Sequence, residues 1–359
     1  MFSFLLEKLL SGLLTLFGVA SVVFFLFNVL PGDPSQMVLD QNATEVQLQK
    51  VKKKYGFDLP IGKQYLIYLN DLLPISFHSK NTNDFTFYSS YKYGGLVLFS
   101  FSKVSVVFKA PYLRTSYQRQ GKKVQTIIAE TLPNTMILAV ASIIIAILLG
   151  FLLGIISGIY KGTWIDKIIQ LISTIGMSVP SFFSAIIFSW IFGYLLNSYT
   201  HLNMTGSLYE LDDFGKGAQL QIKNLILPAF VLGIRPLAVI VQLVRSGLIE
   251  VMSQDYIRTA RAKGLSPLSV IYKHALKNSL NPVITAISGW FASMLAGAVF
   301  VEYIFGWRGI GKEIVTALNT LDIPVVMGSV LIIATLFIII NIFVDLLYAV
   351  IDPKINHFN

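Results

Sequence analysis

Few residues of this 359-residue chain have the types and spacing that chemistry requires. The chain has no cysteine, which excludes disulfides and thiolate metal ligands. Four histidines fall in four different predicted loops or tails and show no metal-ligand spacing: His78, His201, His274 and His357. We therefore predict no catalytic, metal-binding or cofactor-binding residue in the chain.

One segment, GWRGIGKE at residues 306–313, has the glycine and lysine spacing of a phosphate-binding loop. Glu313 stands where such a loop needs a serine or threonine to hold magnesium. The segment also follows a long apolar stretch instead of a strand. We therefore reject a nucleotide site in this chain.

The most informative polar segment is DYIRTARAKGLSPLSVIYKHALKNSLNP, residues 255–282, which lies between two apolar stretches. Six basic residues lie in it or just before it: Arg245, Arg258, Arg261, Lys263, Lys273 and Lys277. The small residues Ala260, Ala262 and Gly264 would allow a partner to approach closely, while the charges orient docking. We expect Gly264 to end a first short helix in the left-handed conformation and Pro267 to break it. The alternative is a solvated basic loop that only sets membrane orientation.

The composition places these residues in a membrane protein. Hydrophobic residues make up 54% and charged residues 13% of the chain, and the mean hydropathy is +0.67. The net charge of +9 is scattered among apolar segments and loops, which excludes a nucleic-acid surface. A bilayer core needs about 20 helical residues, and six apolar runs reach that length. They are residues 9–30, 134–158, 168–196, 225–244, 283–301 and 325–350.

The fold class predicted from these runs is an all-α integral membrane protein with six transmembrane helices. The first run follows Lys8 as a secretion signal would, but it is too long and no small-residue cleavage pattern follows it. Lysine and arginine in the short loops favour both termini, including the tail 351–359, in the cytoplasm. Residues 31–133 would then form a large external segment, which is long enough to escape the charge rule.

The external segment has two patterns. Residues 42–73 have helical spacing, whereas residues 85–108 alternate with period two around Gly94 and Gly95, which predicts a small β-hairpin with its turn at the two glycines. The segment is either a docking surface for an external partner or a cap over the helix ends.

Polar side chains inside the apolar runs are functional candidates, because a charge costs about 3 kcal/mol or more at the bilayer centre. Arg235 lies in mid-span beside Pro236 and could meet a substrate carboxylate in a polar cavity, or could pair with a carboxylate of the same bundle. Asn341 and Asp345 are four residues apart and share a helix face, so we expect them to brace helix packing.

Six blocks, in order, closely resemble the permease subunits of binding-protein-dependent ABC importers, of the oligopeptide, dipeptide and nickel class. They are FGVASVVFFLFNVLPGDP, YGFDLPIGKQYLIYL, AETLPNTMILA, DYIRTARAKGLS, VEYIFGWRGIGKEI and NIFVDLLYAVIDPKI. Residues 74–110 look like an insertion relative to this family. In the EAA loop of such permeases, Arg258 and Thr259 here occupy the glutamate and first alanine positions, which is typical of the peptide class.

The resemblance implies a type I ABC importer permease fold with its core at residues 124–350 and a coupling loop at 245–282 seated in a cytoplasmic ATPase. The implied docking residues are Arg258, Thr259, Ala260, Arg261, Ala262, Lys263, Gly264, His274 and Asn278. The implied partners are a second permease subunit in a heterodimer, two ABC ATPase subunits or domains, and an external solute-binding protein. ATP and magnesium would bind in the ATPase subunits.

These implications predict a peptide importer in the bacterial cytoplasmic membrane. The alternatives are the same machinery carrying nickel or a metal chelate, and an ATP-independent secondary transporter. The secondary transporter would need internal inverted repeats with paired broken helices and would leave the basic segment unexplained.

Overall fold

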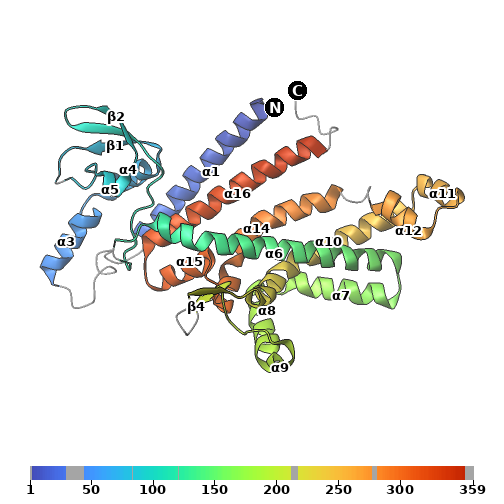
Figure 1. The fold of residues 1–359 in the computed structure, drawn as a ribbon. Helices are drawn as coiled ribbons and strands as arrows, with labels where there is room; N and C mark the ends of the chain where they lie inside the picture. The colour runs from blue at the N-terminus through green and yellow to red at the C-terminus, as the bar shows by residue number, and fades with distance from the viewer. Residues whose placement is uncertain are drawn as a thin grey trace. The chain divides into compact units, whose positions relative to one another are not determined.

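The computed structural model describes residues 2–29, 44–82, 84–119, 121–211, 217–276 and 281–351. Within these ranges five helices are long and apolar enough to cross a membrane, or six if one bent pair counts as a span. The single helices are α1 (Phe2–Val29), α6 (Val124–Ile159), α10 (Lys223–Met252), α14 (Asn281–Phe305) and α16 (Ile323–Ile351) (Figure 1). The predicted all-α membrane fold is confirmed.

The third predicted span is not one straight helix. The chain instead forms α7 (Trp164–Ser178) and α8 (Ser181–Phe188), which continues into the π-helical turn η1 (Ser189–Leu195) and is bent by 110° from α7. Pro180 causes the break, because a proline disfavours helical geometry in the residue before it. Val179 accordingly has the extended angles φ −81° and ψ 130°.

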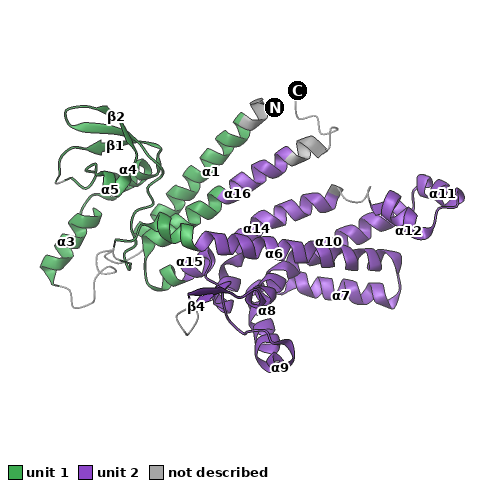
Figure 2. Ribbon diagram, viewed as in Figure 1, with its two compact units in different colours: residues 1–130, 316–335, 357–359 green, residues 131–315, 336–356 purple. Residues whose placement is uncertain are grey.

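The chain divides into two compact units (Figure 2). Among the described residues, the first unit takes its residues from 2–130 and 316–335, and the second takes its residues from 131–315 and 336–351. The second unit holds the basic segment and most of the membrane helices. It also contains the short helix α9 (Asn197–Thr200) and a two-stranded ribbon, β4 (Tyr209–Leu211) with β5 (Ala218–Leu220).

Glycines set the distance between α6 and α10. A Cβ atom added at Gly150, Gly154 or Gly158 would lie 2.7 to 2.8 Å from a side-chain atom of α10. The three glycines are four residues apart and therefore lie on one helix face. Their absent side chains allow the two helices to pack closely, as small residues do in membrane bundles.

The first unit contains most of the external segment predicted from the sequence. Its elements, besides α1, are α3 (Glu45–Tyr55), α4 (Ile61–Leu72), β1 (Ile75–Ser79), α5 (Ser90–Tyr93), β2 (Leu96–Ser100) and β3 (Val104–Phe108). The strands form an antiparallel sheet in the order β1-β3-β2. The predicted helices and hairpin are therefore present, and β1 is a third strand that the sequence pattern did not indicate.

The predicted turn of the hairpin is wrong. The β2–β3 turn lies at residues 101–103, where the Phe101 amide donates to the Val104 carbonyl at 2.9 Å. Gly94 and Gly95 instead precede β2 with φ values of 65° and 81°. A Cβ at Gly95 would lie 2.3 Å from the Phe108 carbonyl oxygen, so this glycine allows close contact with β3.

A polar interior holds α4 against the sheet. The Arg114 guanidinium donates to the Asp71 carboxylate at 3.2 Å, and Asp71 is almost fully buried. His78 is also buried; its Nε2 lies 2.9 Å from the Ser76 hydroxyl, and its Nδ1 lies 3.3 Å from the Thr86 carbonyl. Burial lowers the pKa of His78 to about 4, so the imidazole stays neutral at physiological pH.

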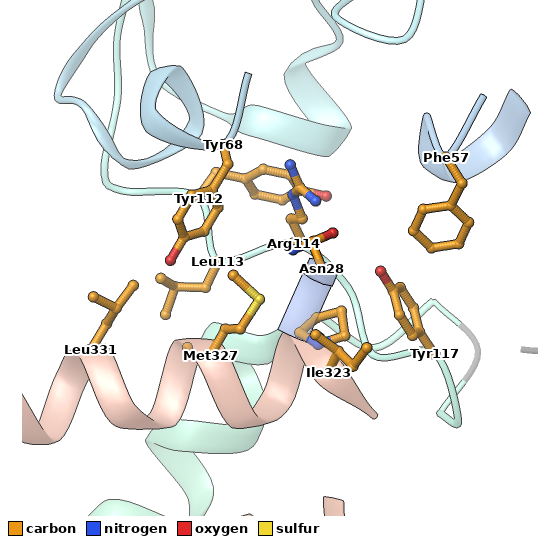
Figure 3. A pocket seen from close by; sticks show the side chains of 12 residues that line it. Asn28, Phe57, Tyr68, Tyr112, Leu113, Arg114, Tyr117, Ile323, Met327 and Leu331 are labelled. Carbon is orange, nitrogen blue, oxygen red and sulfur yellow. The ribbon is translucent and has the colours of Figure 1, made fainter. Parts of the chain in front are cut away.

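A narrow pocket of about 20 Å³ lies within the first unit (Figure 3). Tyr68, Arg114 and Tyr117 line one side of it, and the first turns of α16 line the other through Ile323 and Met327. A space of this volume holds about one water molecule. This pocket therefore has no room for a larger ligand.

Candidate functional site

The basic segment folds into a compact corner at the end of α10. Its described part consists of α11 (Asp255–Ala262), α12 (Pro267–Ser269) and the π-helical turn η2 (Val270–Leu276). The corner has an apolar core of its own, which also includes the last turns of α10: Leu248, Ile257, Ala260, Val270, Ile271 and Ala275. The two short helices are therefore packed onto α10 as one body.

Gly264 ends α11 in the left-handed conformation, with φ +78°, as predicted. The Gly264 amide donates to the Arg261 carbonyl at 2.9 Å, and the Leu265 amide donates to the Ala260 carbonyl at 3.4 Å. This pair of bonds is a Schellman motif. Pro267 does not break this helix; it is the first residue of α12, where its missing amide costs nothing and the Ser266 side chain caps the turn.

The predicted basic rim is exposed. Arg258, Arg261 and Lys263 all face outward, and Arg258 makes a loose pair with Asp255 at 3.4 Å. Thr259 and Ala262 are exposed beside them, whereas the side chain of Ala260 points into the corner's core and is only 6% exposed. Our expectation that Ala260 lets a partner approach is therefore wrong, because this alanine instead lets α11 pack against η2.

Apolar side chains that we did not single out from the sequence accompany this rim. Leu265, Leu268 and Tyr272 are exposed, and Leu268 and Tyr272 are 65% and 60% exposed. Leu268 and Tyr272 are four residues apart in the sequence, a spacing that could have indicated a shared exposed face. The corner thus presents apolar anchors surrounded by positive charge.

The remaining predicted docking residues lie further along the segment. His274 is half-buried on η2, and Lys273 beside it is exposed. Asn278 and Lys277 lie outside the described residues.

Arg245 is not part of the exposed rim. Its guanidinium donates to both carboxylate oxygens of Asp166, from Nε at 2.7 Å and from a terminal nitrogen at 2.8 Å. Asp166 also accepts from the Ser157 hydroxyl at 2.6 Å and from the Gly162 amide at 2.8 Å. Asp166 is 3% exposed and the Arg245 side chain is 26% exposed, so this two-pronged ion pair joins α10 to the α6–α7 turn in a partly exposed site.

The other intramembrane candidates occupy different helices. The side chain of Arg235 is exposed on α10, and within the described residues the structure gives it no hydrogen bond or ion pair. Asn341 and Asp345 are half-buried on α16.

The segment that resembles a phosphate loop holds a carboxylate of the chain itself. Glu302, at the end of α14, accepts from the amides of Gly311 and Lys312 at 2.7 and 3.1 Å, at the start of α15 (Ile310–Asn319). Glu302 is fully buried, and a Cβ on Gly309 would lie 2.3 Å from its oxygens. The position where a helix N-terminus binds an anion is thus already occupied.

The same segment is joined to the start of the membrane part of α6. The Trp307 indole donates to the Asn134 carbonyl at 3.0 Å, and the Asn134 amide donates to the Arg308 carbonyl at 2.9 Å. The Ile310 amide donates to the Thr135 hydroxyl at 2.8 Å. Two of the blocks that carry the family resemblance therefore bind each other in the fold.

The comparisons with known proteins agree with this architecture. Residues 150–357 match the family described as the binding-protein-dependent transport system inner membrane component, and residues 1–139 match the N-terminal family of such membrane components. The chain belongs to this family of inner membrane transport components. It is therefore a multi-pass protein of the bacterial inner membrane.

Curated relatives match along the whole chain. The dipeptide transport system permease protein DppB of Alkalihalophilus pseudofirmus is 34% identical over 99% of this chain and 100% of its own length. The oligopeptide transport system permease protein AppB of Bacillus subtilis is 30% identical, again over 99% of this chain and 100% of its own length.

A solved structure shares the fold. An inward-facing structure of the MetNI methionine ABC transporter has a chain that covers 64% of this one and 97% of itself, at a TM-score of 0.50 and 15% identity. The predicted type I importer permease fold is confirmed.

Proposed function

We propose that this chain is the permease subunit of an ATP-driven importer that moves oligo- or dipeptides across the inner membrane. The observation that carries the proposal is its end-to-end similarity to permeases of dipeptide and oligopeptide transport systems. The exposed corner at the end of α10 supports the ATP-driven part, because it offers a docking surface that a self-sufficient transporter would not need.

In this proposal the ATPase holds the corner through two kinds of contact. Leu265, Leu268 and Tyr272 enter an apolar groove of the ATPase, and the rim of Arg258, Arg261 and Lys263 orients the complex. Because Ile257 and Val270 pack on Leu248 of α10, a displacement of the corner reaches the membrane helix directly. ATP and magnesium bind in the ATPase subunits, and the chain itself performs no chemistry.

The complete machine then contains a second permease subunit, two ATPase subunits or domains, and an external binding protein that delivers the peptide. The corner and both termini face the cytoplasm, and the segment that includes the β1-β3-β2 sheet faces outward. This orientation agrees with the lysine and arginine content of the short loops.

The assembly is testable by purification in a mild detergent. Mass spectrometry of the material that co-purifies with this chain is expected to find an ABC ATPase and a second, related permease. A chain that purifies alone and transports peptides into vesicles without ATP would contradict the proposal.

We further propose that Arg235 lies on the translocation path, since an exposed intramembrane arginine is costly unless it faces a polar cavity. Arg235→Ala is expected to keep the ATPase bound and to lower uptake of peptides with a free C-terminal carboxylate severalfold. Arg235→Lys, which retains the charge, is the control and should retain most uptake. Equal uptake by all three proteins would remove Arg235 from the path.

A further inference from the structure

One face of the β1-β3-β2 sheet is apolar and uncovered. Strand register places six side chains from three strands on this face: Ile75, Phe77, Leu96, Phe99, Val104 and Phe108. All six are exposed, among them Leu96 at 71%, Phe99 at 64% and Phe77 at 60%. A half-buried antiparallel sheet ordinarily turns polar residues outward, so this face is reversed relative to a water-exposed sheet.

The opposite face of the sheet is already used inside the unit. Ser76, His78, Ser105 and Val107 point that way and are buried. Three of these four inward side chains are polar, whereas the outward face is made mainly of apolar side chains. Since a contiguous exposed apolar surface in a folded protein marks an interaction site, the outward face needs an occupant.

The sheet lies beside a membrane-spanning helix. Helix α4 packs against the last turns of α1, where the Ser21 and Tyr65 hydroxyls are 2.6 Å apart and the rings of Phe24 and Tyr68 are stacked at 5.3 Å. The apolar span of α1 runs to Asn28, so the contact at Ser21 begins about 10 Å before the end of the span at 1.5 Å per residue. Helix α4 therefore lies at the depth of the lipid headgroups and outer acyl chains.

The sheet is attached to α4 at that depth. The Asn70 side chain on α4 exchanges two hydrogen bonds with the backbone of Phe77 on β1, at 2.8 and 2.9 Å. Further bonds from Lys109 and Tyr112, just after β3, to the carbonyl of Asp71 hold the same end of the sheet. The sheet is therefore held, through α4, close to the last turns of α1.

The charge around this face fits a lipid surface better than a protein. Residues 75–108 contain three lysines and one aspartate, and the Lys80 amide donates to the Lys103 carbonyl at 3.1 Å, which places two exposed lysines together at the tip of the sheet. Lysines beside an apolar face extend to lipid phosphates. The tryptophan, tyrosine and arginine that anchor protein interfaces are absent from the three strands, each of which the structure describes in full.

We propose that this sheet face is a membrane-binding surface that lies in the interfacial layer of the leaflet surrounding the C-terminal end of α1. Phe77, Phe99 and Leu96 enter the acyl-chain boundary, and Lys80 and Lys103 contact anionic headgroups. The sheet would then lie flat on the bilayer and hold α4 and its neighbouring loops at a fixed height.

The absence of cysteine from the chain makes the test direct. Phe77→Cys and Phe99→Cys are each labelled with a nitroxide in the full-length protein, in vesicles of phosphatidylcholine and phosphatidylglycerol. Tyr91→Cys, at an aromatic position on α5 outside the sheet that is 84% exposed, is the control. Accessibility to oxygen, which partitions into lipid, is compared with accessibility to a water-soluble nickel chelate.

The labels at Phe77 and Phe99 are expected to show an oxygen-to-nickel accessibility ratio severalfold above that at Tyr91. The ratio should fall toward the control when Lys80 and Lys103 are both changed to glutamine or when phosphatidylglycerol is omitted. A ratio equal to the control at both positions would overturn the proposal. Protection that develops only when the second permease or the binding protein is added would assign the face to that protein instead.

Discussion

Exchanging both exposed arginines of α11 in the double variant Arg258→Glu and Arg261→Glu is expected to reduce peptide uptake at least about tenfold, since repulsion between like charges across an interface costs several kcal/mol. Both side chains point away from the corner's apolar core, so the chain should still insert and fold. The measurement is the amount of ATPase that co-purifies with the chain, together with uptake of a radiolabelled dipeptide in cells.

Two further variants make this prediction specific. Lys161→Glu also reverses a positive charge, but at an exposed position in the α6–α7 turn outside the corner, and is expected to leave uptake unchanged. Leu268→Asp is expected to match the double variant, because it places a carboxylate in the proposed apolar groove. Full ATPase binding by the double variant would refute docking through this surface.

The second large effect is expected at the Asp166–Arg245 ion pair. Asp166→Ala leaves the partly exposed Arg245 guanidinium without its two-pronged partner and should lower the free energy of unfolding by about 2–3 kcal/mol, as for other hydrogen bonds to charged groups. Denaturant or thermal unfolding of the purified chain in detergent would measure the loss. Ser157→Ala removes a single hydrogen bond to the same carboxylate and should cost only about 1 kcal/mol.

A double variant separates the ion pair from a general packing defect. Changing both Asp166 and Arg245 to alanine removes both charges, so its cost should be well below the sum of the two single substitutions. Additive costs would mean that the two residues stabilise the fold independently. Asp166 lies at the start of α7, beside the α6–α7 turn. We therefore expect Asp166→Ala to reduce peptide uptake without preventing insertion of the chain into the membrane.

Much of the fold followed from length and hydropathy. The spans were predictable because every backbone group in a bilayer must be bonded within its own helix, which gives long apolar runs a single solution. The corner was predictable because a cluster of charged residues together with glycine and proline ends an apolar run where the chain leaves the membrane. The left-handed Gly264 followed from the same local chemistry.

The features that could not be predicted depend on contacts between distant residues. The bend at Pro180 could equally have been a kink within one span, since proline permits both, and the neighbouring helices decide the angle. The hairpin turn was misplaced because Gly94 and Gly95 have turn chemistry, but Gly95 is needed for contact with Phe108. Ala260 was misassigned because a small residue suits a partner's surface and an internal core equally well.

The candidate site likewise has features that local sequence predicts and features that only contacts between distant residues determine. No local pattern indicated that Arg245 pairs with Asp166, 79 positions away, while Arg258 and Arg261 lie on the exposed surface of the corner. Similarly, Glu302 and the glycines of residues 306–313 are close in sequence, but only the fold shows that the loop encloses a carboxylate of the chain. The local pattern thus identified the basic segment. Only tertiary packing shows that Arg245 forms an ion pair inside the fold while Arg258 and Arg261 remain on the surface.

The glycine face of α6 has a consequence for how force passes through the molecule. Because Ile240, Val244 and Leu248 of α10 pack against the three glycines of α6, and Arg245 is bonded to Asp166 near one end, α6 and α10 have little freedom to slide. The corner packs against Leu248 of α10. A displacement of the corner would therefore tilt α6 and α10 together as one rigid pair. Within the described part of the second unit, the interruption at Val179 and Pro180 is a place where the chain can bend, because continuous helical hydrogen bonding is broken there.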